Sequence, residues 1–344
     1  MKIFKRILIW AMISIAIQMS GFYYINKYYL SDETNIKVSK LQKNTDTAKS
    51  IEVAVPAGID KINASYNGKY VAYDDEGVLN IVDMSTGEKK TVSFESGVEI
   101  SSYKWLSDRN RMLIAEKHTT SRGISFELAY YDVDKDTKEK IEDLAWTGNS
   151  AEVSDIEASP LTNVIFIKIA LNDEQSTIYW MNIMANKKKV STVTSSIGNI
   201  RIVPHEDKLL YENTNNNKVY MTGSKSALSV GTTGEAVLLS VDNNDNAYIG
   251  ELSNDGTISR VYYGQTGSAT STYSVVELGK AVSRDAILVS GEGKIYLNDN
   301  FTGTITDIAS AKQFSYKGNF QQIYEGGILS LSDNKLVKTP IIEN

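Results

Sequence analysis

The chain contains no cysteine among its 344 residues, which excludes disulfides, thiolate metal sites and the lipidated cysteine of a lipoprotein. It has two histidines, His118 and His205, each expected in or beside a turn. Neither has a second histidine at a spacing that suits a metal. Prolines are also few, and each falls at an expected strand end or turn: Pro56, Pro160, Pro204 and Pro340. Proline interrupts strand ladders, so this scarcity suits a protein rich in β-structure.

Motifs of enzymes and cofactor sites are missing as well. The sequence has no Gly-x-Ser-x-Gly nucleophile elbow and no phosphate-binding Gly-x-x-x-x-Gly-Lys-Ser/Thr loop. Residues 132–136 (Asp-Val-Asp-Lys-Asp) match the opening of a calcium loop, but the glycine at its sixth place and the glutamate at its twelfth are absent. We expect a plain turn there, and another at the Asp/Asn-rich residues 242–246. The sequence therefore predicts no catalytic, cofactor-binding or metal-ligating residue.

The charge balance narrows the partners. The formal net charge is −6, and residues 26–344 carry 33 basic and 42 acidic side chains, a net charge of −9. An acidic domain of this kind does not suit nucleic acid, which we exclude as a partner. The lysines at 187–189 are an exception, and we expect them at a turn, as a solvated edge that discourages strand addition.

Three tryptophans lie in the expected β-rich region. Trp105 and Trp180 fall inside strand patterns, so we expect both to pack in the core between structural units rather than to stack on sugars. Trp146 follows the second unit in an Ala-Trp-Thr-Gly loop, where we expect it to be exposed.

The N-terminus has the pattern of a membrane anchor. Lys2, Lys5 and Arg6 precede residues 7–25, which carry no charge and as a helix would be about 28 Å long, close to the thickness of a bilayer core. A cleaved secretory signal is the alternative, but its apolar region is usually shorter and ends in small residues. We expect a single-pass helix with residues 1–6 in the cytoplasm, a polar stalk at 26–50 and the rest outside the cell.

A repeated phrase occupies the remainder of the chain. Its clearest copy, Ser-Tyr-Asn-Gly-Lys-Tyr-Val-Ala-Tyr at 65–73, reads as a strand end, a glycine turn and a second strand. The start of that second strand recurs at Met112, Val164, Leu209, Ala247, Ile287 and Ile328. The spacing averages 43 residues, which is typical of a β-propeller with several short strands in each blade.

The repeat predicts an all-β fold over residues 51–342, a propeller of seven four-stranded blades; six or eight blades are the alternatives. The final unit is one strand short, and residues 51–55 (Ile-Glu-Val-Ala-Val) form a strand pattern that no unit uses. Pairing this strand with the last blade would close the ring and remove two open edges.

The phrases at 65–73 and 159–167 resemble the Ser-Pro-Asp-Gly-Lys phrase of TolB-like propellers, which also marks WD40-like repeats and the N-terminal propeller of dipeptidyl peptidase IV. The resemblance covers residues 51–342 and implies architecture rather than activity. The Gly-His…Trp-Asp signature of true WD40 repeats is absent, and no residues remain for the hydrolase domain of the peptidases.

Two functions fit these observations. The first is a non-enzymatic, membrane-anchored platform outside the cytoplasm that binds an envelope protein or polymer on one propeller face. The alternative is a carbohydrate-active or other hydrolytic propeller that uses carboxylates around the central channel. The expected inner strands offer mainly apolar and small residues with scattered charges, which favours binding.

Overall fold

The computed structural model describes residues 2–28, 52–59, 61–121, 123–144 and 150–342. The chain divides into two compact units, Met1–Ala48 and Lys49–Asn344. In the first unit, α1 (Lys2–Tyr28) is, among the described residues, the one helix long and apolar enough to cross a membrane, over Phe4–Tyr24. The expected stalk lies almost wholly outside the described residues.

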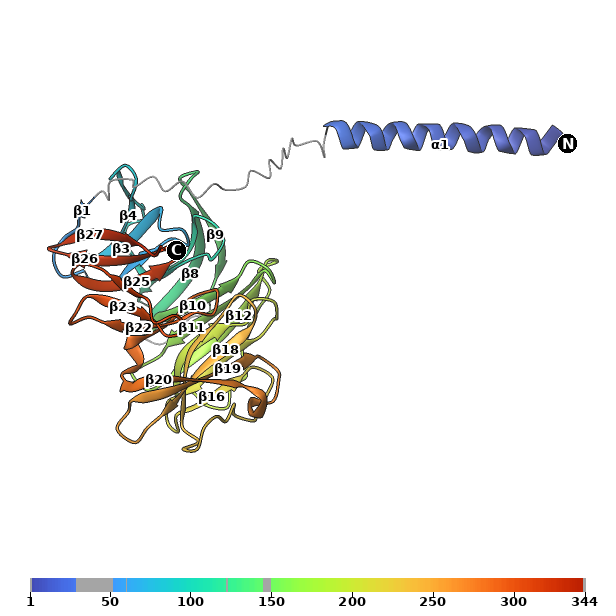
Figure 1. Cartoon of the computed structure of the whole chain (residues 1–344). Helices are drawn as coiled ribbons and strands as arrows, with labels where there is room; N and C mark the ends of the chain where they lie inside the picture. Colours follow the sequence, from blue (N-terminus) through green and yellow to red (C-terminus); the bar gives the residue numbers. More distant parts are fainter. Residues whose placement is uncertain (1, 29–51, 60, 122, 145–149, 343–344) are drawn as a thin grey trace. The chain divides into compact units, whose positions relative to one another are not determined.

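The second unit consists of seven antiparallel sheets arranged as a propeller, which confirms the predicted fold class (Figure 1). The strands of the first three blades, in the order in which they pair, have the following bounds. Blade 1 contains β2 (Ile62–Ala64), β3 (Tyr70–Asp75), β4 (Val78–Asp83) and β5 (Lys89–Thr91). Blade 2 contains β6 (Val98–Trp105), β7 (Arg111–Thr120), β8 (Gly123–Asp132) and β9 (Thr137–Asp143). Blade 3 contains β10 (Glu152–Ser159), β11 (Val164–Ala170), β12 (Ser176–Asn182) and β13 (Lys187–Lys189).

The remaining blades follow the same order, except that the outer position of blade 4 is irregular. Blade 4 contains β14 (Ile197–Ile202), β15 (Leu209–Asn213) and β16 (Lys218–Met221). Leu228 occupies its outer position and donates its N–H to the Val219 carbonyl over 2.8 Å. Blade 5 contains β17 (Ala236–Val241), β18 (Asn246–Leu252), β19 (Ile258–Gln265) and β20 (Ser274–Val282), with the short helix η1 (Thr270–Thr272). Blade 6 contains η2 (Arg284–Ala286), β21 (Ile287–Val289), β22 (Ile295–Asp299), β23 (Thr304–Asp307) and β24 (Gln313–Ser315).

Blade 7 is completed by a strand from the other end of the unit. It contains β25 (Asn319–Tyr324), β26 (Gly327–Ser332), β27 (Lys335–Pro340) and β1 (Val53–Ala54). β1 pairs antiparallel with β27, Val53 opposite Leu336 and Ala54 opposite Lys335. The Val55 N–H extends this pairing to the Asn334 carbonyl, at 2.8 Å. Figure 1 shows the result, in which the blue strands of blade 1 lie beside the red strands of blade 7.

The hydrophobic core is divided among the joints between blades. Seven clusters of buried residues occur, and each joins a blade to its neighbour. At the joint between blades 1 and 2, for example, Leu79 and Ile81 pack with Met112 and Trp105. A propeller blade has two faces to bury, so each sheet contributes alternate side chains to the cluster on either side.

The first strand of each blade lies innermost, because these strands contact one another from blade to blade: β6 with β10, β10 with β14, β14 with β17, β17 with β21 and β25 with β2. Strands alternate in direction, so the turns after the first and third strands share one face of the ring. On this face, which we call the AB/CD face, neighbouring turns are hydrogen-bonded to one another. The Ser159 hydroxyl donates to the Pro204 carbonyl at 2.5 Å, and the Asn243 N–H donates to the Gly291 carbonyl at 2.8 Å.

Two details of the strand assignment differ from the sequence prediction. Ile287 begins β21, the first strand of blade 6, whereas the repeat predicts a second strand there; that second strand is β22, eight residues later. The apolar residues that start at Ile287 are followed by a glycine turn, Gly-Glu-Gly at 291–293, and so resemble the repeated phrase. This resemblance explains why the second strand was predicted too early. His118 lies within β7 instead of in a turn, because β7 and β8 form a long hairpin in which His118 pairs with Ser125.

Candidate functional site

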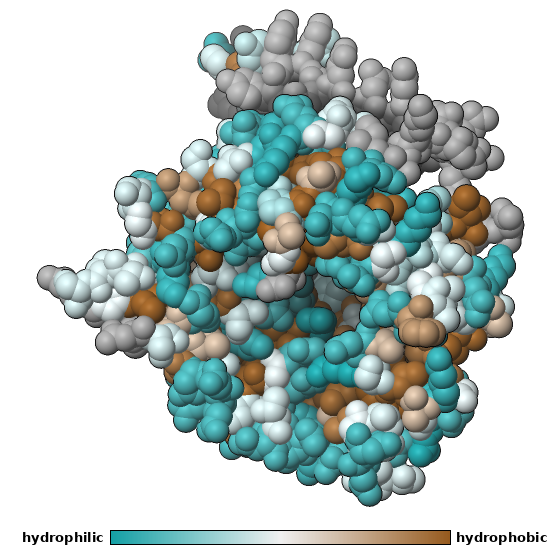
Figure 2. Space-filling model, turned by 90° about the vertical axis from the view of Figure 1, so that its left-hand side faces the viewer, coloured by the Kyte–Doolittle hydropathy of each residue, from teal (hydrophilic) through white to brown (hydrophobic). Residues whose placement is uncertain are grey.

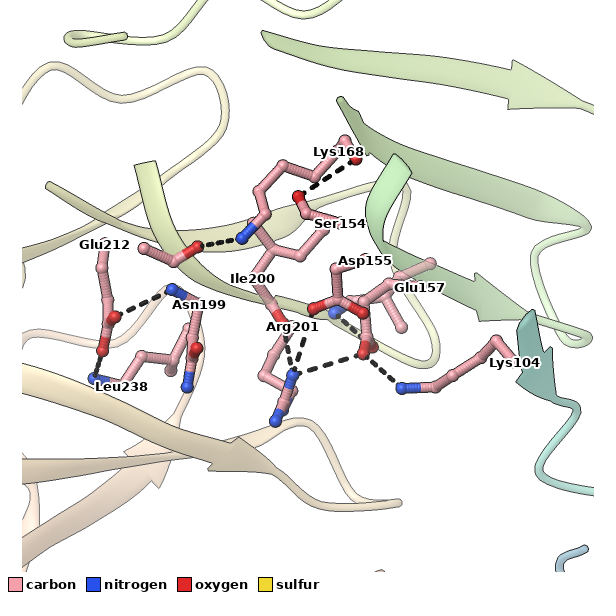
Figure 3. Close-up of polar contacts among 12 residues, drawn as sticks. Lys104, Ser154, Asp155, Glu157, Lys168, Asn199, Ile200, Arg201, Glu212 and Leu238 are labelled. Atoms are coloured by element: carbon pink, nitrogen blue, oxygen red, sulfur yellow. Dashed lines mark hydrogen bonds and ion pairs between the residues drawn. The ribbon is translucent and has the colours of Figure 1, made fainter. Parts of the chain in front are cut away.

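The inner strands of blades 2, 3 and 4 carry a partly buried charge cluster that the sequence pattern did not predict (Figure 3). Glu157, on β10, is buried and accepts hydrogen bonds from Lys104 Nζ at 2.8 Å and from the Ile202 N–H at 3.3 Å. Arg201 on β14 reaches the same carboxylate at 3.4 Å. One side chain of blade 3 therefore holds a cation from each neighbouring blade.

Asp155 lies two residues before Glu157, so the two side chains share a face of β10. Arg201 lies 3.8 Å from Asp155. Burial and the neighbouring Glu157 charge raise the pKa of Asp155. Burial alone would raise the pKa of Glu157 too, but Lys104 and Arg201 outweigh it and lower that pKa. The two carboxyl groups thus differ in how well their charges are compensated.

A third carboxylate, that of Glu212 on β15, makes contacts on the other side of the cluster (Figure 3). Its oxygens accept hydrogen bonds from the Asn199 N–H at 2.8 Å and the Leu238 N–H at 2.6 Å. Arg284, on η2 of blade 6, donates to the same carboxylate at 2.7 and 3.2 Å. Glu212 therefore connects blade 4 to blades 5 and 6.

Lys168, on β11, lies between these carboxylates. Its ammonium group donates to the Gly198 carbonyl at 2.8 Å, and burial lowers its pKa in spite of the nearby Asp155 and Glu212 charges. Glu157 and Glu212 each contact cations of neighbouring blades, so these two carboxylates join strands across blade joints. Alternating charges on one expected inner strand were the signal available in the sequence, but only the structure places their partners beside them.

The acidic turn at 132–136 also joins blades. It connects β8 to β9, as predicted, and its side chains pair with cations of blades 1 and 2. Asp134 accepts hydrogen bonds from Lys69 at 3.2 Å and from the Tyr70 hydroxyl at 2.9 Å, and Asp132 pairs with Arg111 at 2.8 Å. Within the described part of the chain, no group of three or more His, Cys, Asp or Glu side chains is arranged to hold a metal.

The turn at 242–246 is structural as well. It joins β17 to β18, and Asp242 is buried with its Oδ1 accepting hydrogen bonds from the Asn244 and Asn246 N–H groups at 2.9 and 2.8 Å. Asp245 accepts a hydrogen bond from the backbone N–H of His205 at 3.0 Å and lies 3.2 Å from that residue's Nδ1. The contact between Asp245 and His205 therefore links the turns of blades 4 and 5 on the AB/CD face.

Of the tryptophans, Trp105 is buried between blades 1 and 2, which confirms its predicted position. Trp180 was predicted to be buried in the same way, but it is only partly buried. Its indole Nε1 donates to Asp207 of blade 4, and Lys188 lies over its ring, 4.2 Å from the centroid. Trp146 lies outside the described residues.

Trp180 borders a cavity of about 750 Å³ between blades 3 and 4, which we call the blade 3–4 groove. Phe166, Val190 and Val193 supply apolar lining, and cationic side chains come from Lys188, Lys189, Lys208 and Lys225. Lys188 and Lys189 belong to the outer strand β13, not to the turn that the sequence predicted. The lysines at 187–189 form this edge strand themselves, because their backbone pairs with Tyr179, Trp180 and Met181 of β12.

Two turns of blade 3, close in sequence to residues that line the groove, expose large apolar side chains on the AB/CD face. Leu161 follows the first strand, and Ile183 and Met184 follow the third; their exposed fractions are 64%, 77% and 77%. Figure 2 shows one face of the molecule, where hydrophobic residues form separate patches among hydrophilic ones and the surface is hollowed near the middle. Exposed apolar side chains grouped on one blade are typical of contact surfaces.

Comparison with known proteins identifies the fold of the chain but no related family or curated protein. No family model matches the chain, and no curated protein matches it. A chain of the crystal structure of the mitotic checkpoint complex aligns with a TM-score of 0.55 and 12% identity, over 85% of this chain and 94% of that chain. The WD40 β-propeller domain of Doa1 aligns with a TM-score of 0.54 and 14% identity, over 86% of this chain and 97% of that domain. The protein therefore has a WD40-like seven-bladed propeller fold.

Proposed function

We propose that the chain is a membrane-anchored, extracytoplasmic platform that binds a partner protein at the cell envelope through the AB/CD face of its propeller. The observation that carries this proposal is the exposed trio Leu161, Ile183 and Met184. These side chains project from turns on a face whose neighbouring turns are hydrogen-bonded together. A rigid face with exposed apolar side chains loses little conformational entropy when a partner covers it.

The hydrolytic alternative has less support. It requires carboxylates that are free to act on a substrate around the channel. Glu157 and Glu212 are instead buried and engaged by Lys104, Arg201 and Arg284 from neighbouring blades. The WD40-like fold is typical of interaction platforms, and this favours the binding platform over the hydrolase.

The lack of cysteine allows a direct test of the anchor and its orientation. We expect Phe301→Cys, at a position that is 99% exposed, to react with a membrane-impermeant thiol reagent on intact cells. Lys2→Cys lies before the apolar span and should react only after permeabilisation, since Lys5 and Arg6 hold that end in the cytoplasm. Labelling of Lys2→Cys but not Phe301→Cys on intact cells would reverse the proposed topology. Release of a shortened chain from the membrane would favour a cleaved signal.

Partner binding is tested by charging the apolar trio. We expect Leu161→Asp, Ile183→Asp and Met184→Asp, combined in one chain, to lower recovery of copurified proteins from solubilised membranes by about tenfold. The exposed positions should leave the fold intact, which circular dichroism checks. Phe301→Asp is the matched control, because Phe301 lies in the turn after the second strand of blade 6, on the opposite face. Equal recovery with the triple variant and the control would contradict a role for the AB/CD face.

A further inference from the structure

We infer that the blade 3–4 groove binds a short, extended, acidic peptide segment that also carries an apolar side chain. This inference rests on the proposed platform function and names the chemistry of one of its contacts. The groove coincides with the irregular outer position of blade 4, where Thr222, Gly223 and Lys225 form its wall. Its volume of about 750 Å³ lies within the range of pockets that enclose a ligand.

The cations of the groove exceed its anions. Lys208 pairs with Glu206, and the single lining carboxylate, Asp207, accepts the Trp180 N–H. Among the residues that the structure describes, no carboxylate forms an ion pair with Lys188, Lys189 or Lys225. All three lysines are exposed. Carboxylates of a bound segment would therefore meet cations that have no counter-ion among the described residues.

The apolar lining defines the other half of the ligand. Phe166 is almost fully buried, yet its ring borders the groove, with Val190 and Val193 beside it. An aliphatic or aromatic side chain placed there would remove apolar surface from water. The neighbouring strand β13 is the outer edge of blade 3. Its lysines discourage pairing with an ordinary strand but would attract an extended segment that carries carboxylates.

Sugar polymers and nucleic acids fit the groove less well. Trp180 is poorly placed to stack on a sugar or base, because Lys188 covers its ring and Asp207 holds its indole N–H. The net charge of −9 over residues 26–344 repels a long polyanion. A short segment is affected less, since physiological salt screens charges beyond about 8 Å.

The test measures anisotropy of a fluorescein-labelled peptide of alternating glutamate and leucine, mixed with the full chain in detergent micelles. We expect binding that weakens with added salt. The double variant Lys189→Glu/Lys225→Glu should bind about tenfold to thirtyfold more weakly, because it removes two attractions and adds two repulsions. The control Lys280→Glu/Lys317→Glu makes the same change in net charge at exposed lysines of blades 5 and 6 and should bind as the native chain does.

Three results would overturn the inference: no peptide binding by the native chain, equal binding by the groove variant, or stronger binding of the anionic polysaccharide polygalacturonate. Circular dichroism of the groove variant separates lost binding from lost folding, and Lys189→Gln/Lys225→Gln should bind with intermediate strength. If the peptide fails to bind while the Leu161/Ile183/Met184 variant still loses its copurified partner, the groove assignment is wrong and the platform function stands.

Discussion

Replacing Glu157 with glutamine is expected to lower the free energy of unfolding by about 3 kcal/mol at neutral pH. Lys104 and Arg201 both contact Glu157 across two blade joints, so the loss of its charge leaves two cations without their shared counter-ion. The expected cost lies at the lower end for buried pairs because both cations reach partly into solvent. Chemical denaturation followed by circular dichroism measures it.

Asp155→Asn is the matched control, and its effect should have the opposite sign. The pKa of Asp155 is raised in the folded protein, so the folded state binds its proton more tightly than the unfolded chain does. Stability from this group is therefore lost as pH rises through the raised pKa, and asparagine should stabilise the protein at neutral pH. For Glu157, whose pKa is lowered, stability is lost as pH falls through that pKa. A destabilising Asp155→Asn would contradict this division of roles.

Leu336→Ala is expected to cost about 3–4 kcal/mol and, in addition, to loosen β1. Leu336 is fully buried at the joint of blades 7 and 1 and lies opposite Val53. Because β1 is held by two register pairs and the Val55 N–H, a cavity beneath it should raise exchange of the amides that hold it, among them the Val55 N–H.

Leu278→Ala provides the comparison, since Leu278 is buried on the outer strand of blade 5 and faces the joint with blade 6. It should lower stability to a similar degree without changing exchange in β1. Native-state hydrogen exchange read by mass spectrometry distinguishes the two variants. Unchanged protection of β1 in Leu336→Ala would show that β1 is held independently of that side chain.

Most of the architecture could be predicted from periodicity, because strand alternation and turn glycines are local properties of the sequence. The first blade illustrates this: β3 and β4 begin at the predicted residues, Tyr70 and Val78. The predicted start of a second strand at Ile287 was wrong, because the first and second strands of a blade are both short apolar runs that only their pairing distinguishes.

The candidate sites were much less accessible from sequence. The sequence separation is 53 residues between Lys104 and Glu157 and 44 residues between Glu157 and Arg201. No local sequence pattern predicts that these side chains meet. The groove depends likewise on how the outer strand of blade 3 faces the irregular edge of blade 4. Trp180 shows the limit clearly, since its strand pattern alone suggested a buried side chain, whereas its surroundings place it at the groove.

The position of β1 determines how mechanical load enters the propeller. The chain reaches the ring through residues 29–51, so tension along the polypeptide acts first on β1. The closure lies inside blade 7, where β1 and β27 are joined by hydrogen bonds, packing and the ion pair of Glu52 with Lys335, whereas consecutive blades are linked covalently. Tension strong enough to detach β1 would expose the edge of β27. This would happen before the tension separated the longer strands of blades 2 and 3. In a tethered protein, this short strand would be the first part of the ring to yield.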